Sequence, residues 1–190
     1  MARILIVGGG CPGRRLGERM LQSGHAVRIT TRTEAGRAGI EAVGAECWIG
    51  TPDRLATLRG SLENVTVACW MLAGAHGPAQ EIAALHRSRL EFFLGQAIDT
   101  TVRGLIYDIS IEGGSAGGGS GGSRGGGGSD AQQGDGVVSA QTLAAGERIF
   151  RSMTELNAIP SVVLDCGSGD GEAWVDAATV AVDSLLGGGR

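Results

Sequence analysis

The chain contains no lysine, because all 16 of its basic residues are arginine. Any mechanism that requires a lysine of this chain is therefore excluded. Aromatic residues are also scarce, at 4% of the sequence, and Tyr107 is the single tyrosine. No apolar run approaches the roughly 18 residues that a membrane-spanning helix needs, so we expect no membrane association.

Paired cysteines and a basic charge are also missing. The four cysteines stand far apart, without a Cys-x-x-Cys pair, and no secretory signal precedes the first apolar run. This pattern favours a reducing, cytoplasmic location. The formal net charge of −4 argues against nucleic acid as a partner, since proteins that bind it usually carry a basic patch.

Glycine, by contrast, is abundant, at 35 of 190 residues. Thirteen of these glycines fall between residues 112 and 136, together with four serines and no large apolar side chain. Such a stretch buries too little apolar surface to offset the entropy lost on ordering. We predict a flexible loop over 112–136 within a single domain that spans residues 1–190.

Outside this loop, short apolar runs alternate with amphipathic stretches. The runs predict strands over 3–7, 26–31, 46–49, 64–72, 104–109 and 160–165, and the stretches predict helices over 13–23, 34–43, 51–62, 78–100, 138–157 and 172–186. This alternation indicates right-handed crossovers in a parallel sheet covered on both faces. We expect an α/β fold with a doubly wound, mostly parallel six-stranded sheet in the order 3-2-1-4-5-6.

Gly8, Gly10 and Gly13 form a G-x-G-x-x-G motif between the first strand and the first helix, with Cys11 and Pro12 inside it. In that position, the three glycines allow a tight turn, a close approach of backbone to a pyrophosphate, and close packing of helix on strand. The motif predicts a dinucleotide site at the helix N-terminus. The alternative is a tight turn without a ligand.

The second predicted strand ends in Thr30, Thr31, Arg32 and Thr33. An NAD site usually has an acidic residue here for the ribose 2′-hydroxyl, whereas arginine and hydroxyl groups suit a 2′-phosphate. Thr30 occupies the expected acid position, so we predict NADP as the cofactor, with Arg32 and Thr31 at the phosphate. NAD stays an alternative, because Glu34 is also in reach of a ribose.

Residues 4–33 resemble the atypical and extended short-chain dehydrogenases/reductases, an NAD(P)-binding Rossmann family that includes nucleotide-sugar epimerases. Trp70 to Gly74 is similar to the stretch that lies along the cofactor in that family, which implies cofactor contacts from Leu72, Ala73 and Gly74. The family transfers protons through a serine after the fifth strand and a Tyr-x-x-x-Lys pair. Ser110 loosely matches the serine, but Tyr107 lies within the predicted fifth strand and the chain has no lysine.

Other polar residues are weaker candidates. His76 follows the fourth predicted strand, at the edge where ligands of such sheets bind, and is a candidate acid or base or else an ordinary loop histidine. Asp108 and Asp165 end strands at the same edge, where they either contact a ligand or cap turns. His86 reads as a solvated helix residue. No grouping has the spacing of metal ligands, so we expect no metal.

Two functions compete on this basis. The first is an NADP-dependent reductase or epimerase-like oxidoreductase of a small-molecule substrate, with water or His76 as proton donor. The second is a non-catalytic dinucleotide-binding sensor or subunit, which the missing tyrosine and lysine favour. The first 33 residues alone also resemble deazaflavin-dependent NADP reductases. The substrate and the oligomeric state, a homo-oligomer included, stay open.

Overall fold

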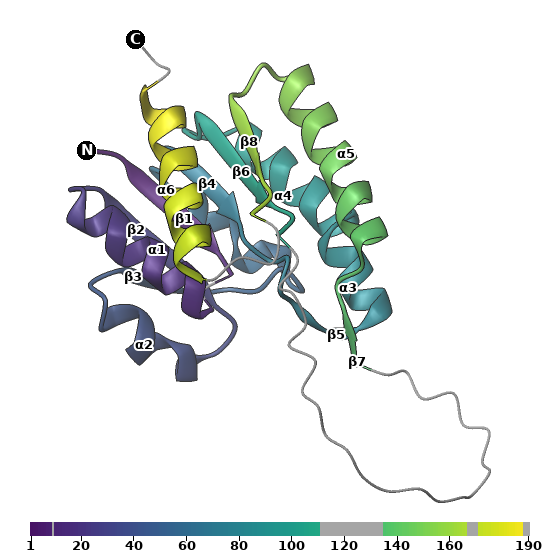
Figure 1. Ribbon diagram of the computed structural model, residues 1–190, viewed down its shortest axis with the longest axis horizontal. Helices are drawn as coiled ribbons and strands as arrows, with labels where there is room; N and C mark the ends of the chain where they lie inside the picture. The colour runs from purple at the N-terminus through teal and green to yellow at the C-terminus, as the bar shows by residue number, and fades with distance from the viewer. Residues whose placement is uncertain (9, 111–134, 167–170, 188–190) are drawn as a thin grey trace, which may run out of the picture.

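The computed structural model describes residues 1–8, 10–110, 135–166 and 171–187. Six parallel strands form one sheet in the order β3-β2-β1-β4-β6-β8 (Figure 1). Their bounds are β1 (Arg3–Val7), β2 (Ala26–Thr31), β3 (Glu46–Ile49), β4 (Val67–Trp70), β6 (Gly104–Asp108) and β8 (Ser161–Leu164). The strands β5 and β7 belong to a separate small sheet, so β6 and β8 are the fifth and sixth strands of the large one. The predicted fold class and the order 3-2-1-4-5-6 are therefore confirmed.

Helices cover both faces of the sheet, as Figure 1 shows. One face carries α1 (Cys11–Gln22), α2 (Arg37–Glu41) and α6 (Gly171–Gly187), and the other carries α3 (Ala79–Leu85), α4 (Ser88–Ile98) and α5 (Ala140–Leu156). Successive side chains of β1 point to opposite faces of the sheet and so enter the hydrophobic core on each side. Ile4 and Ile6 pack on the first face, and Leu5 and Val7 pack on the second. All four side chains are fully buried, which explains the uninterrupted apolar run of this strand.

The predicted helix over 51–62 is wrong. The Thr51 hydroxyl instead accepts a hydrogen bond from the Asp53 amide, and the Arg54 amide bonds the Thr51 carbonyl. Two short 3₁₀ turns follow, η2 (Leu55–Thr57) and η3 (Arg59–Leu62). Hydrogen bonds from a threonine to nearby backbone compete with helix formation. Thr51, which was predicted to cap a helix, therefore accepts the hydrogen bonds of a turn.

The single helix predicted over 78–100 is two helices. The chain breaks at His86 and Arg87, between α3 and α4. His86 was expected to be solvated, but it is fully buried, and its Nδ1 lies 2.7 Å from the hydroxyl of Tyr107. Because the polar side chain of His86 lies in the core, the residues around it do not continue the spacing of apolar positions that predicted one helix. The helix predicted over 34–43 is likewise a 3₁₀ turn, η1 (Glu34–Gly36), followed by the short α2.

A two-stranded antiparallel sheet was not predicted. It pairs β5 (His76–Pro78) with β7 (Asp135–Val137). The predicted loop over 112–136 therefore ends in a strand, and its remaining residues, 112–134, lie outside the described residues. In the part of the chain that the structure describes, no helix is long and apolar enough to cross a bilayer.

Candidate functional site

A cavity of about 1160 Å³ opens at the carboxyl edge of the large sheet. Its walls come from the ends of β1, β2, β4 and β6, from the first turns of α1 and α6, and from the segment between β2 and α2. The order of the strands reverses between β1 and β4, and ligands of open α/β sheets bind at such a point. The volume lies slightly above the range of roughly 300–1,000 Å³ that is usual for small-molecule and cofactor sites. The cavity is therefore the candidate functional site.

The turn from β1 into α1 forms one wall of the cavity. Gly8 has a φ of +104°, a conformation that side-chain-bearing residues rarely adopt, so this turn requires a glycine. A Cβ on Gly13 would lie 2.6 Å from the Gly8 carbonyl oxygen, so Gly13 lets the helix pack on the turn. A Cβ on Gly10 would meet nothing closer than 3.9 Å. Protein packing does not require Gly10 to be glycine, and its surroundings leave room for a ligand.

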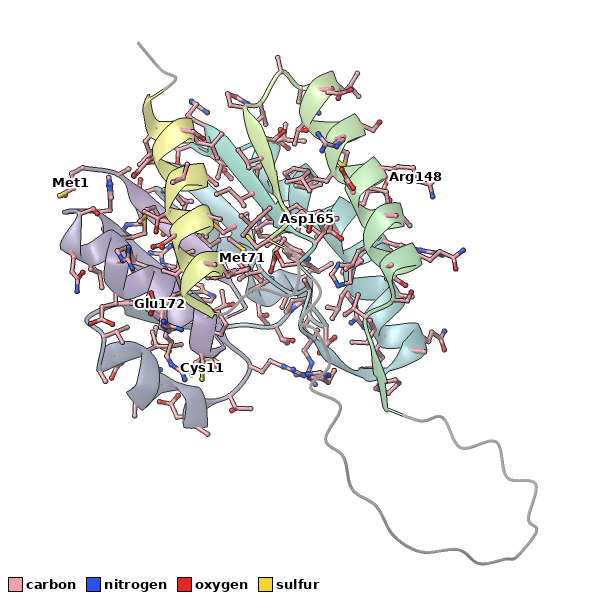
Figure 2. The ribbon with its side chains drawn as sticks, in the orientation of Figure 1. Met1, Cys11, Met71, Arg148, Asp165 and Glu172 are labelled. Carbon is pink, nitrogen blue, oxygen red and sulfur yellow. The ribbon has the colours of Figure 1, made fainter. Side chains whose placement is uncertain are left out.

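The N-terminus of α1 has no side-chain cap among the described residues. Its N-cap residue is Gly10, and Pro12, the second residue of the helix, has no amide hydrogen to satisfy. In α5, by contrast, the Ser139 hydroxyl accepts a bond from the Thr142 amide at 3.1 Å. Amides and the positive end of the dipole at an uncapped helix start attract an anion. Figure 2 shows Cys11 at this end of α1, with Met71 deeper in the molecule.

The end of β2 forms a second wall. The Thr30 hydroxyl accepts the Gly8 amide at 3.3 Å, so this residue supports the glycine turn. Thr31 and Arg32 line the cavity, and Arg14 lines it from α1. A Cβ on Gly39 would lie 3.8 Å from the Arg14 guanidinium, which places that side chain beside α2. Two arginines therefore border the cavity near the end of β2.

Glu34, the alternative ribose ligand, is engaged elsewhere. Both of its carboxylate oxygens bond the guanidinium of Arg37, the second at 3.2 Å, and the Arg37 contact lowers the pKa of Glu34. Glu34 does not line the cavity. Of the described residues that do line it, Asp108 is the one carboxylate.

Met71, Leu72, Gly74 and Ala75 follow β4 and line the third wall. Ala73 is buried and packs away from the cavity, with Ile82 and Leu143. Of the residues predicted to contact a cofactor, the cavity is lined by Gly8, Gly10, Cys11, Pro12, Gly13, Thr31, Arg32, Leu72 and Gly74, and Ala73 does not line it.

The two candidates for proton transfer lie differently. Ser110 is buried and lines the cavity, and its hydroxyl accepts the Cys166 amide at 3.1 Å. His76 is exposed in β5 and does not line the cavity. Tyr107 is fully buried and bonded to His86, within the core.

Asp108 lies beside Ser110 at the end of β6 and is 5% exposed. Its Oδ1 accepts the Ser110 amide at 3.0 Å. Burial raises the pKa of Asp108 above its ordinary value, while hydrogen bonds from Ser110 and from the Trp174 side chain oppose that rise. A buried carboxyl with a raised pKa at a cavity wall is a candidate for proton transfer.

The sequence analysis missed Arg14 and Trp174 as cavity residues. Helix periodicity places Arg14 on the polar side of α1, but only the position of α2 turns that side into a cavity wall. Trp174 reaches the cavity because ion pairs join α6 to α1, among them Arg19 to Asp176 at 3.0 Å. Figure 2 shows Glu172, which pairs with Arg15 and Arg19, at the start of α6. Such long-range contacts leave no local signal in the sequence.

Metal ligands do not gather at the site. Over residues 1–8, 10–110, 135–166 and 171–187, no three His, Cys, Asp or Glu side chains come close enough to hold a metal ion.

Neither a protein-family model nor a curated protein sequence matches the chain. Solved structures do match it. UDP-glucose 4-epimerase from Thermotoga maritima, solved with UDP-glucose, aligns with a TM-score of 0.62 at 16% identity, over 86% of this chain and 54% of that one. A short-chain dehydrogenase/reductase superfamily protein from Agrobacterium tumefaciens with bound NAD aligns with a TM-score of 0.58 at 16% identity, over 86% and 48%.

Triphenylmethane reductase from Citrobacter sp., complexed with NADP(H), aligns with a TM-score of 0.55 at 15% identity, over 86% of this chain and 48% of that one. The chain spans about half the length of these proteins. At such low identity the likeness establishes the fold, which this chain shares with the epimerase and the reductases.

Proposed function

We propose that the chain binds NADP(H) along the cavity and acts as an oxidoreductase on a small substrate. The observation that carries this proposal is the corner between β1 and α1, where Gly10 borders open space and no side chain caps the helix. The residues present fit a dinucleotide there, because the oxygens of a diphosphate accept hydrogen bonds from such amides. When bound, the nicotinamide group accepts or donates hydride.

The fold neighbours support this assignment. One is solved with bound NAD and another with NADP(H). In the proposed pose the adenosine half lies near Gly36 and Ile40, and the nicotinamide half near Met71 and Leu72, which places the diphosphate at the glycine corner between them.

A preference for NADP(H) over NAD(H) follows from the charges around the end of β2. Arg32 and Arg14 border this part of the cavity, and Glu34 is paired with Arg37 outside it. A 2′-phosphate carries negative charge and accepts bidentate bonds from guanidinium groups, whereas a ribose hydroxyl is usually bound by an acid. Arg32 is the proposed principal ligand of the phosphate.

The other candidate function is a dinucleotide-binding sensor or subunit without catalysis. It is favoured by the position of Tyr107, which is bonded to His86 in the core, and by the absence of lysine. Tight binding of NADPH without its oxidation by any member of a panel of carbonyl compounds would support the sensor.

Titration of the protein with NADPH, NADP⁺, NADH and NAD⁺ tests the proposal. A charge-assisted bond to phosphate is worth about 1.5–3 kcal/mol, so Arg32→Ala should weaken NADPH binding at least about tenfold while NADH binding changes little. Arg148→Ala, on the exposed side of α5, is the matched control and should bind both nucleotides as the wild type does (Figure 2).

Two results would count against the proposal. An unchanged ratio of NADPH to NADH affinity in Arg32→Ala would show that the phosphate lies elsewhere. Failure of all four nucleotides to bind at millimolar concentration would overturn dinucleotide binding itself.

A further inference from the structure

Asp108 lies at the end of the cavity where the proposed function puts the reacting half of the cofactor. The described residues that line this end with it are uncharged: Met71, Leu72, Gly74, Ala75, Ser110 and Trp174. Among the described residues that line this end, Asp108 is therefore the one carboxyl group, and so the candidate for giving or taking a proton.

The carboxyl group is held from three parts of the fold. Its Oδ1 accepts the Ser110 amide at 3.0 Å, and the Trp174 side chain on α6 donates a second bond. The Ser110 hydroxyl in turn accepts the Cys166 amide, just after β8. The Ser110 side chain bonds the carboxyl group as well. A carboxylate offers about four acceptor positions, so these three donors fix the group and leave it able to bond a ligand in the cavity.

The charged and titratable groups around Asp108 come from several elements. Asp165 and Cys166 follow β8, and Tyr107 precedes Asp108 on β6. Arg14 lines the cavity from α1, and Arg15 lies against Gly171 at the start of α6. Burial, with a smaller contribution from Asp165, raises the pKa of Asp108, so this carboxyl keeps its proton to higher pH than an exposed aspartic acid does.

We propose that Asp108 is the catalytic residue that gives a proton to the carbonyl oxygen of an uncharged aldehyde or ketone and takes it back in the reverse reaction. This inference rests on the proposed function. In the forward direction the carbonyl carbon accepts hydride from the reduced nicotinamide dinucleotide, and the π electrons of the C–O bond move to oxygen, which takes the Asp108 proton. The products are an alcohol, the oxidised dinucleotide and the Asp108 carboxylate, which regains a proton from water.

The charge of this end of the cavity selects the substrate class. The two arginines that line the cavity, Arg14 and Arg32, come from α1 and from the end of β2, and the described lining residues beside Asp108 carry no charge. A substrate bearing phosphate or carboxylate finds no cation among the described lining residues beside Asp108. An uncharged carbonyl compound is compatible with the apolar wall of Met71 and Leu72.

The test compares wild type with Asp108→Asn and, as matched control, Asp183→Asn, which changes an exposed aspartate of α6 outside the cavity lining. Asparagine keeps the acceptor oxygen for Ser110 and Trp174, so the fold and the binding of NADPH, followed by its fluorescence, should be preserved. With 4-nitrobenzaldehyde as probe, kcat/KM of Asp108→Asn should fall by about 10²–10⁴-fold, the usual contribution of a general acid.

Two further readouts separate catalysis from structure. In wild type and Asp183→Asn, kcat/KM for reduction should decrease as the pH rises through the pKa of Asp108, and Asp108→Asn should lack this decrease. Difference infrared spectra should show, without substrate, a carboxylic acid band that titrates above the ordinary aspartate pKa of 3.8 and is lost only in Asp108→Asn.

The outcomes are distinct. Wild-type kcat/KM in Asp108→Asn, titration of Asp108 at its ordinary pKa, or NADPH binding by wild type without reduction of the aldehyde would each overturn the assignment of Asp108 and leave dinucleotide binding standing. Failure of wild type to bind NADPH would overturn the proposed function, and the role of Asp108 with it.

Discussion

Gly10 and Gly13 lie three residues apart at the start of α1, yet a methyl group would meet different surroundings at each. At Gly13 it would clash with the backbone of Gly8, whereas at Gly10 it would project into open space. Packing explains Gly13, whereas the proposed diphosphate would explain Gly10. Substitution by alanine separates the two explanations.

We expect Gly13→Ala to lower the free energy of unfolding by about 1–3 kcal/mol, the usual cost of overpacking. Gly10→Ala should leave the unfolding free energy nearly unchanged and weaken NADPH binding, because its methyl group occupies the space of the diphosphate. Gly95→Ala, which adds a methyl group to an open position in α4, is the control for both assays. Urea unfolding and NADPH titration provide the measurements. Normal NADPH binding by Gly10→Ala would contradict a ligand at this corner.

At this scale the sequence predicts well whatever depends on a local motif. The spacing of Gly8, Gly10 and Gly13 identifies the corner between β1 and α1. Arg32 lines the cavity, and its contact with a phosphate stays a prediction. The prediction that His86 is solvated was wrong, because its burial involves a contact between residues far apart in the sequence. Its ring is buried against the Tyr107 hydroxyl, which is 21 positions away in the sequence and comes close only in the folded chain.

At the scale of elements, the break between α3 and α4 introduces a buried histidine. Burial lowers the pKa of His86 to about 4 from its ordinary 6.5, although the Leu72 backbone acts in the opposite direction. As the pH falls through 6.5 toward 4, the unfolded chain takes up a proton at this residue and the folded chain does not. The free energy of unfolding should therefore decrease on acidification in this window, by about 3 kcal/mol at its full extent.

Urea unfolding at a series of pH values tests this prediction. His86→Gln keeps a polar partner for Tyr107 without titrating, so its unfolding free energy should depend less on pH between 6.5 and 4. His76→Gln changes an exposed histidine in β5 and should retain the wild-type dependence. An identical dependence in wild type and His86→Gln would mean that His86 takes up its proton in the folded state at its ordinary pKa.

The predicted bounds agree with the structure for β1 and β2 and differ by up to two residues for α1. Prediction failed at Thr51, where threonine, proline and aspartate form a turn that satisfies the same hydrogen bonds as a helix cap. It failed again at β5 and β7, because three-residue strands have no period to detect.

At the scale of the whole molecule, alternation of strands and helices was sufficient to predict the strand order and hence the position of the cavity.

A ligand that binds only the folded chain stabilises it. NADPH at 100 times its Kd should raise the unfolding free energy by about 2.7 kcal/mol, which corresponds to an increase in Tm of roughly 5–11 °C for a domain of this size.

Thermal denaturation at increasing NADPH concentration measures this shift. NADH at the same concentrations should give a smaller shift in wild type, and Arg32→Ala should reduce the difference between the two nucleotides. A Tm that does not depend on the concentration of NADPH would contradict a specific site on the folded chain.

The helix α6 contributes to the core and to the cavity at the same time. Ala178 and Val182 on this helix pack in the core beside Ile4 and Ile6, and Trp174 on the same helix lines the cavity. A local opening that detaches α6 from the sheet would therefore expose apolar surface and open a wall of the cavity in one event.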